Sequence, residues 1–158
     1  MPVNDRVINF ENCQIIHRNF AGEVDPNYNK NGDREFSLIL QPDMADQLQA
    51  DGWNVKRKRP INDPDAPELI YTSIKVAFGK FPPRIYMVCG ENLQTLTEAE
   101  LHILDNADII KCDLTINPYH WTRQRESGVK GYLKIGYFTI REEPFAEKYK
   151  HLKPGGRV

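Results

Sequence analysis

Apolar and polar residues alternate along residues 108–117, and this period of two constrains the fold more than any other feature. Successive side chains of a β-strand point to opposite faces of a sheet, so the pattern predicts a strand with one buried face. The inward row is Ile110, Cys112, Leu114 and Ile116, and the outward row is Lys111, Asp113, Thr115 and Asn117. Residues 69–78 predict a second such strand, with Ile70, Ile74, Val76 and Phe78 inward and Tyr71, Ser73, Lys75 and Ala77 outward.

The rest of the chain is also mainly strand-like. Segments rich in β-branched and aromatic residues predict strands or extended chain at residues 13–20, 34–40, 53–59, 84–89 and 132–141. One short helix is predicted from Pro42 to the stop at Gly52, and a second from the capping-box pair Thr97 and Glu100 to Asn106. Turn formers, prolines and an Arg- and Gly-rich stretch predict loops at residues 21–33, 61–68 and 122–131.

Six or seven strands with two short helices predict an all-β fold, a barrel or a sandwich. A helix placed late in the strand order also occurs in five-stranded oligonucleotide-binding barrels, the OB fold. The length of 158 residues suits one domain, with a charged tail from about residue 142.

Composition favours a cytoplasmic protein that does not enter a membrane. The three cysteines, Cys13, Cys89 and Cys112, are odd in number and scattered, which indicates a reducing compartment and no disulfide framework. No apolar run approaches the ~20 residues of a membrane helix, and the first residues lack the pattern of a signal peptide.

Two basic segments contain aromatic residues, although the formal net charge is only −1. A basic run by itself is usually a solvated face. Aromatic rings beside clustered cations, however, are what single-stranded nucleic acid requires, because bases stack on rings while phosphates lie in a positive groove. The first segment is Trp53, Lys56, Arg57, Lys58 and Arg59, and the second is Tyr119, Trp121, Arg123, Arg125, Lys130, Tyr132 and Lys134.

The aromatic residues differ in what their positions predict. Tyr119 and Trp121 share one face if their segment is extended, with Arg123 next on that face. Tyr71 lies on the polar face beside Lys75, where it is either a binding residue or simply exposed. Trp53 follows the helix-stopping Gly52 and either stacks on a base or anchors the helix. We expect Phe36, Phe78 and Tyr137, which alternate with aliphatic residues, to be core residues.

Enzymatic and metal chemistry find little support. Cys13 and His17 form the only pair at ligand spacing, so we predict no metal, no cofactor and no catalytic residue. A small metal-dependent nuclease or resolvase using Asp105, Asp108 and Asp113 remains an alternative, although Asp108 and Asp113 would point to opposite faces of a strand. Another alternative is a protein-binding module that acts on a host factor through its aromatic surface.

A colinear set of short motifs resembles tailed-phage single-stranded DNA-binding proteins over residues 14–149. The motifs are Arg18-Asn19-Phe20-x-Gly22, Tyr28-Asn29 with Gly32, Arg34-x-Phe36, Gly52-Trp53-x-Val55-Lys56, Pro82-Pro83, Leu104-Asp105, Pro118-Tyr119-x-Trp121 and Gly131-Tyr132-Leu133. The resemblance implies an OB-fold domain that coats single-stranded DNA during phage replication or recombination in the bacterial host cytoplasm, without catalysis. Many single-strand binders end in an acidic tail that recruits partners, but residues 148–158 are mainly basic, so recruitment through such a tail is not implied.

We therefore predict a sequence-independent single-stranded DNA-binding protein. Candidate partners besides the DNA are replication or recombination proteins and further copies of the chain. The predicted DNA-binding residues are Arg18, Tyr28, Arg34, Trp53, Lys56, Arg57, Lys58, Arg59, Tyr71, Lys75, Tyr119, Trp121, Arg123, Arg125, Lys130, Tyr132 and Lys134.

Overall fold

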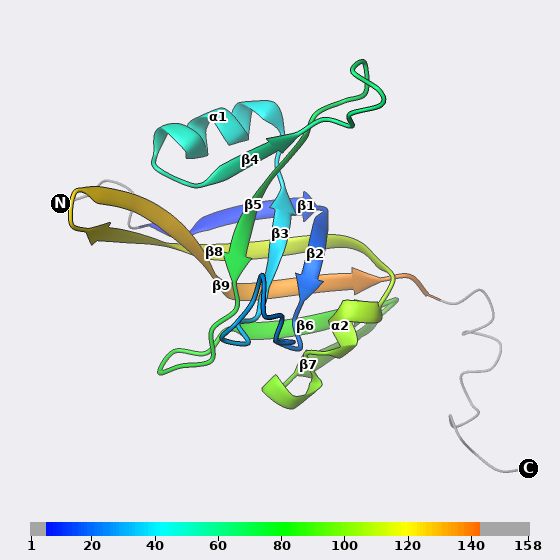
Figure 1. Ribbon diagram of the computed structural model, residues 1–158. Helices are drawn as coiled ribbons and strands as arrows, with labels where there is room; N and C mark the ends of the chain where they lie inside the picture. Colours follow the sequence, from blue (N-terminus) through cyan, green and yellow to red (C-terminus); the bar gives the residue numbers. More distant parts are fainter. Residues whose placement is uncertain (1–5, 143–158) are drawn as a thin grey trace, which may run out of the picture.

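The structure, a computed structural model, describes residues 6–142; the predicted charged tail lies outside this range except for its first residue. Within these residues nine strands form one curled sheet, accompanied by two short α-helices (Figure 1). The strands are β1 Ile8–Cys13, β2 Ile15–Asn19, β3 Glu35–Ile39, β4 Val55–Lys58, β5 Leu69–Lys75, β6 Arg84–Cys89, β7 Asn92–Leu96, β8 Ile109–Arg123 and β9 Glu126–Ile140. The helices are α1 Pro42–Ala50 and α2 Ile103–Asn106. The predicted all-β class with two short helices is confirmed.

Strand β9 organises the sheet. It pairs with β8 in antiparallel fashion along its whole length. On its other edge it pairs in parallel first with the end of β5, at Gly131 and Tyr132, and then with β6 from Ile135 onward. Because β9 changes neighbours halfway along, the sheet bends: β5, β3 and β2 cross in front of β8, β9 and β6 in Figure 1.

The core fills the inside of this bend. Phe20, Phe36 and Phe138 are fully buried, with ring centroids 5.3–6.1 Å apart. Helix α1 closes one end by burying Ala45 and Leu48. Neither α-helix has the length or apolar character needed to cross a membrane. The core prediction is confirmed for Phe36 and wrong for Tyr137, which is 39% exposed.

Several local predictions are corrected. Ile110 is exposed because β8 carries an extra residue between Ile109 and Lys111, and this bulge turns Ile110 out of the inward row. The loop predicted at residues 122–131 is instead the end of the β8–β9 hairpin. Strands β1 and β7 were not predicted. The second predicted helix is interrupted: the capping box forms at Thr97 and Glu100, but it starts a short 3₁₀ turn before α2.

Candidate nucleic-acid interface

The β8–β9 hairpin carries most of the predicted aromatic and basic residues on one face. The strands join through a tight turn at Gln124 and Arg125, with Gln124 in the left-handed region at φ 56°. The register of the two strands shifts between Thr115 and Ile116, but the extra residue, Lys134, lies on β9. The odd-numbered residues of β8 from Lys111 to Arg123 therefore share a face. Across the hairpin, Tyr119 pairs with Lys130 and Trp121 pairs with Gly128. The prediction that Tyr119 and Trp121 share a face is therefore confirmed.

Trp121 lies directly over its cross-strand partner. A Cβ atom placed on Gly128 would come within 2.7 Å of Cζ2 and 3.0 Å of Nε1 of the indole. The ring thus rests against the backbone of β9, which is possible only because position 128 has no side chain. The indole remains half-buried and lines a hollow of about 490 Å³ between the hairpin and strands β4 and β5.

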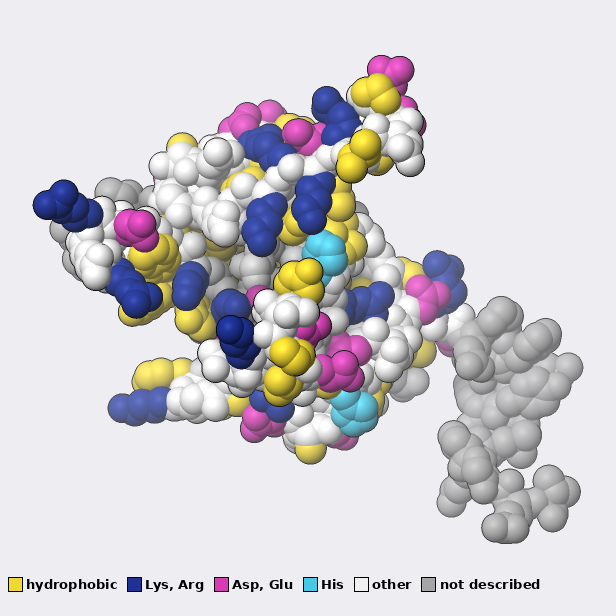
Figure 2. Space-filling model, in the orientation of Figure 1, with side chains coloured by type: hydrophobic (Ala, Val, Ile, Leu, Met, Phe, Trp, Pro, Cys, Tyr) yellow, Lys and Arg dark blue, Asp and Glu magenta, His cyan; other side chains and the backbone are white. Residues whose placement is uncertain are grey.

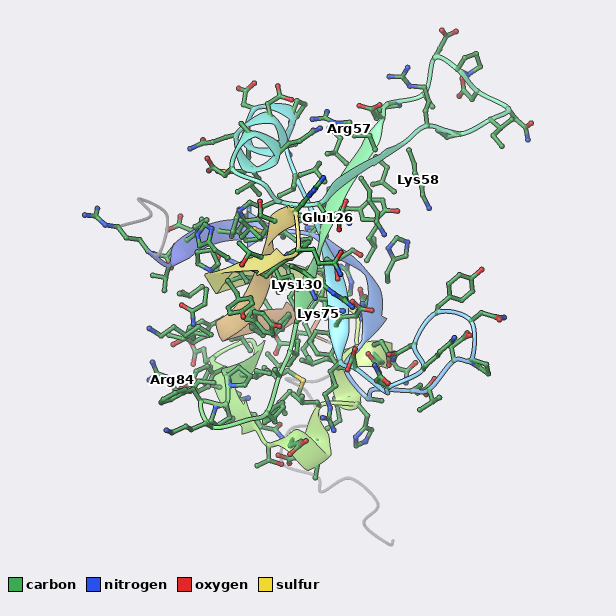
Figure 3. All side chains as sticks on the ribbon, turned by 60° about the vertical axis from the view of Figure 1, so that its left-hand side comes forward. Arg57, Lys58, Lys75, Arg84, Glu126 and Lys130 are labelled. Carbon is green, nitrogen blue, oxygen red and sulfur yellow. The ribbon has the colours of Figure 1, made fainter. Side chains whose placement is uncertain are left out.

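Three lysines surround this hollow. Lys56 comes from β4, Lys75 from the end of β5 and Lys130 from β9. Lys75 and Lys130 lie next to one another in the middle of this face (Figure 3). In Figure 2, Lys and Arg side chains extend from the hairpin end across the centre of the face, below α1 and β4. Among the described residues, Lys56 and Lys130 form no ion pair, so their charges are available to a bound anion.

One carboxylate lies among these lysines. Glu35 on β3 accepts hydrogen bonds from Lys75 Nζ at 2.8 Å and from Ser73 Oγ at 2.7 Å. Burial alone would raise the pKa of Glu35, but these hydrogen bonds, with the charges of Lys75 and Lys56, outweigh it and hold the pKa below its ordinary value. Glu35 is therefore ionised at neutral pH and holds Lys75 in place.

The hollow continues along β9 as a groove. Lys75 and Lys130 also line a second hollow, which includes Tyr132. Tyr132 in turn lines a third, with Tyr119, Phe81, Pro82, Arg84 and Lys134. The rings of Tyr119 and Tyr132 meet edge to face, with centroids 6.0 Å apart. We call these three connected hollows the central groove; it joins a tryptophan, a group of lysines and a pair of tyrosines.

The structure brings about half of the predicted binding residues into the central groove. Those lining it are Arg34, Lys56, Lys75, Tyr119, Trp121, Lys130, Tyr132 and Lys134. Arg123 and Arg125 lie at the hairpin end beside a separate hollow. Tyr28 and Arg59 are exposed in loops outside the groove lining.

Two predicted stacking residues are core residues instead. Trp53 is 5% exposed and packs over Gly131, where a Cβ atom would come within 2.5 Å of the indole. Tyr71 is also 5% exposed, because His17 meets its ring edge at 5.1 Å and Lys58 Nζ lies 5.8 Å from its centroid. The prediction that Tyr71 is exposed is wrong: β2 and β4 cover what a single alternating strand presents as a polar face.

Three predicted arginines are held by protein groups. Arg18 donates to the carbonyl oxygens of Leu104 and Ala107 at 2.9 and 2.6 Å. Arg34 donates to the Phe20 carbonyl and pairs with Glu98. Arg57 pairs with Asp46 at 2.9 Å and with Glu68 at 3.7 Å. These side chains stabilise loops and the α1–β4 contact, so their charges are partly neutralised.

Four of the groove residues that sequence reasoning missed bear directly on charge or ring contacts: Glu35, Phe81, Arg84 and Gly128. Phe81 had a usable signal, since a large apolar residue between Gly79 and two prolines has little chance to enter a core. Phe81 is indeed exposed. The other three show nothing unusual in the sequence, because their roles depend on strands that pair from distant segments.

The carboxylates of the nuclease alternative serve other contacts. Asp105 accepts the backbone N–H groups of Phe20 and Ala21, and Asp113 accepts that of Asn12. Asp108 pairs with Arg141 at 2.7 Å. Among residues 6–142, no three His, Cys, Asp or Glu side chains gather in a way that could hold a metal ion.

Cys13 and Cys112 are not activated thiols. Cys13 and Cys112 face one another across β1 and β8 as free thiols. Burial raises the pKa of Cys13 to about 11 and that of Cys112 to about 12, so both thiols are protonated at neutral pH.

Comparison with solved structures supports the fold. The single-stranded DNA-binding protein of bacteriophage Enc34, in a C-terminally truncated form, matches with a TM-score of 0.55 at 12% identity, covering 92% of this chain and 95% of that one. The untruncated Enc34 protein matches with a TM-score of 0.53 at 13% identity, covering 100% of this chain and 93% of that one. The predicted OB-like fold is confirmed by this similarity.

Comparison of sequences supports the family. No curated protein sequence matches the chain at a significant level. The model of a family described as a putative phage ssDNA-binding domain matches residues 3–154. This match covers nearly the whole chain and confirms the resemblance seen in the motifs. The chain therefore belongs to the family of phage single-stranded DNA-binding domains.

Proposed function

We propose that the chain binds single-stranded DNA along the central groove, without sequence preference and without catalysis, during phage replication or recombination inside the bacterial host. The observation that carries the assignment is the continuity of the groove. Its lysines lie between Trp121 at one end and the Tyr119–Tyr132 pair at the other. Phosphates at the lysines and bases on the rings would use both features at once.

The lining also suits indifference to sequence. Aromatic faces accept any base, and lysines contact phosphates, which are the same at every nucleotide. Among the described residues, the amide and carboxylate side chains of the lining, Asn54, Asp33, Asn117 and Glu35, are divided among the three hollows, and Glu35 is held by Lys75 and Ser73. We expect modest preferences among homopolymers and none that depends on a motif.

A fluorescence titration tests the proposal. Labelled single-stranded and duplex oligonucleotides of equal length are titrated at several salt concentrations. If about four phosphates are neutralised, log K should fall with log salt with a slope near −3, at roughly 0.7 per contact. A salt-independent affinity or a preference for duplex contradicts the proposal, and magnesium-dependent cleavage of the labelled strand would support the nuclease alternative instead.

A further inference from the structure

A second pair of aromatic rings lies on β9 and β6, beyond the lining of the central groove. Tyr137 pairs with Tyr86 in the parallel β6–β9 ladder, and their rings stack with centroids 4.8 Å apart and planes 18° from parallel. The sequence pattern places Tyr137 in the core, yet it is 39% exposed, and Tyr86 is half-buried. The neighbouring residues Phe138 and Ile85 fill the core from the opposite face of the two strands.

The register places this pair on the same face of the sheet as the groove aromatics. Along β8, Asp113 and Tyr119 are both odd-numbered, and the register shift between them leaves its extra residue, Lys134, on β9. The two side chains therefore share the outward face of β8. Asp113 is the cross-strand partner of Tyr137, as Asn117 is of Tyr132. The Asn117–Tyr132 pair and the Asp113–Tyr137 pair are four residues apart along β8, a distance of about 13 Å.

Arg84 connects the two places. It lines the tyrosine end of the central groove, and it stands two residues before Tyr86 on β6, therefore on the same face. Its partner in the ladder is Ile135, two residues before Tyr137. Arg84 is exposed, and Figure 3 shows it well away from the Lys75–Lys130 pair. A single strand of DNA that leaves the groove past Arg84 would reach the stacked Tyr86 and Tyr137 next.

Charge on this path is favourable. Arg84 and the exposed Lys134 stand at its start, and Lys111 is exposed one outward position beyond Asp113. Asp113 is the acid nearest the tyrosines in the register, and it accepts the backbone N–H of Asn12 at 2.9 Å. An exposed ring pair with cations before and after it fits a polyanion that carries stacking bases better than it fits a neutral apolar partner.

We propose that Tyr86 and Tyr137 form an additional base-stacking subsite, at which single-stranded DNA extends from the central groove across β9 and β6. The subsite rests on the proposed function, since it continues the same path. Phosphates between the groove and the subsite would contact Arg84 and Lys134. A base would stack on the exposed face of Tyr137, whose other face is supported by Tyr86. The subsite lengthens the binding site rather than replacing any part of the groove.

The test compares oligonucleotide lengths. Wild type and the double variant Tyr86→Leu/Tyr137→Leu are titrated with oligothymidines of about 6 and about 16 nucleotides, which span the site sizes of OB folds. We expect wild type to bind the longer strand more tightly. The double variant should bind the longer oligonucleotide with about five- to a hundredfold lower affinity than wild type, and the shorter one with nearly unchanged affinity. Leucine preserves apolar cross-strand contact, and melting temperatures establish that the variant is folded. Ile61→Ala, at an exposed apolar residue that neither lines the groove nor belongs to the predicted DNA-binding residues, is the control.

The outcomes separate the two proposals. If wild type binds neither strand, the proposed function fails. Suppose that wild type binds both oligonucleotides. If the double variant then has unchanged affinity for the longer one, or an equal loss of affinity for both, DNA binding in the groove is supported and the subsite is wrong. If the variant changes self-association while DNA affinity is unaltered, the face is a protein interface, which also overturns the subsite. If the double variant falls short of folding, the single variant Tyr137→Leu, which removes the exposed ring and keeps Tyr86, provides the same length comparison.

Discussion

The two tryptophans of the chain make the same kind of contact with a glycine of β9, but one lies in the core and the other lines the central groove. Trp53 lies over Gly131 and Trp121 lies over Gly128, and in both cases a Cβ on the glycine would clash with the indole. Positions 128 and 131 are three residues apart on β9, so they face opposite sides of the strand. Trp53 is consequently buried in the core, and Trp121 lines the central groove.

The difference shows that composition around a tryptophan does not determine its role. Trp53 is followed by four consecutive cations, and it is nevertheless a core residue. Trp121 lies among equally basic residues and lines the groove. What separates them is the face of β9 that each ring meets, which is fixed by the register of the β8–β9 hairpin.

The largest effect should come from Trp53→Ala. Truncating a buried tryptophan removes its contacts and leaves a cavity, which costs roughly 3–5 kcal/mol of stability. Denaturant unfolding measures the loss. The affinity of the fraction that remains folded should be nearly unchanged, because Trp53 does not line the groove. A large loss of affinity with normal stability would show that the burial of this ring does not describe the protein in solution.

Trp121→Ala should give the reverse result. One base–ring stack contributes roughly 1–3 kcal/mol, so affinity should fall about five- to a hundredfold while the salt slope stays the same. Stability should fall far less than in Trp53→Ala, because the indole is only half-buried. A Trp53→Phe variant leaves Trp121 as the single tryptophan, and its fluorescence should be quenched on saturation with oligothymidine. Unchanged affinity together with early melting would place Trp121 in the core.

The glycines sharpen the comparison with smaller changes. Gly131→Ala forces a methyl group into the contact between Trp53 and Ile74, and overpacking of this kind costs about 1–3 kcal/mol of stability. Gly128→Ala instead displaces the indole of Trp121, which can move outward. We expect it to reduce affinity more than stability. Equal effects of the two substitutions on stability would contradict the difference between the two faces.

The sequence predicts the regular strands well because alternation is a local property. Residues 111–117 and 70–75 occur as strands with the expected inward side chains, apart from the bulge at Ile110. The Arg- and Gly-rich stretch was predicted as a loop because glycine usually marks turns. Here Gly128 and Gly131 lie inside a strand, where two indoles occupy the space of their missing side chains.

The site was predicted in part for the same reason. Several basic and aromatic residues of the hairpin line the central groove, because the strand pattern fixes which residues share a face; their contact with DNA stays a prediction. Tyr71 was misplaced because its covering residues, His17 and Lys58, belong to strands that join β5 from elsewhere in the chain. Arg57 looks identical to its neighbours in sequence, and only the packing of β4 beside α1 brings Asp46 to it.

Cations that face the groove should therefore contribute more to DNA affinity and to its salt dependence than cations paired with carboxylates. Lys130→Gln removes a charge from the groove, so the salt slope should become shallower by about 0.7, with about fivefold weaker binding at 0.1 M salt. Arg57→Gln removes a charge already paired with Asp46 and Glu68, and should change both quantities much less. Titration at several salt concentrations measures both. Equal slopes for the two variants would indicate that the whole basic surface binds diffusely.

The smallest effect should come from Glu35→Gln, and it should be a gain of affinity. The substitution removes the negative charge that holds Lys75, whose attraction for a phosphate should then rise by up to about fivefold, the equivalent of ~1 kcal/mol for a surface ion pair. The same variant should also show a changed dependence of the free energy of unfolding on pH in the acid range. Because the folded-state pKa of Glu35 lies below its ordinary value of 4.5, its contribution is present above that value and is lost as pH falls through the folded-state pKa. Glu35→Gln lacks this contribution, so its stability should decline less steeply below about pH 4.5. Weaker DNA binding by the variant would mean that Glu35 positions Lys75 for the phosphate rather than competing with it.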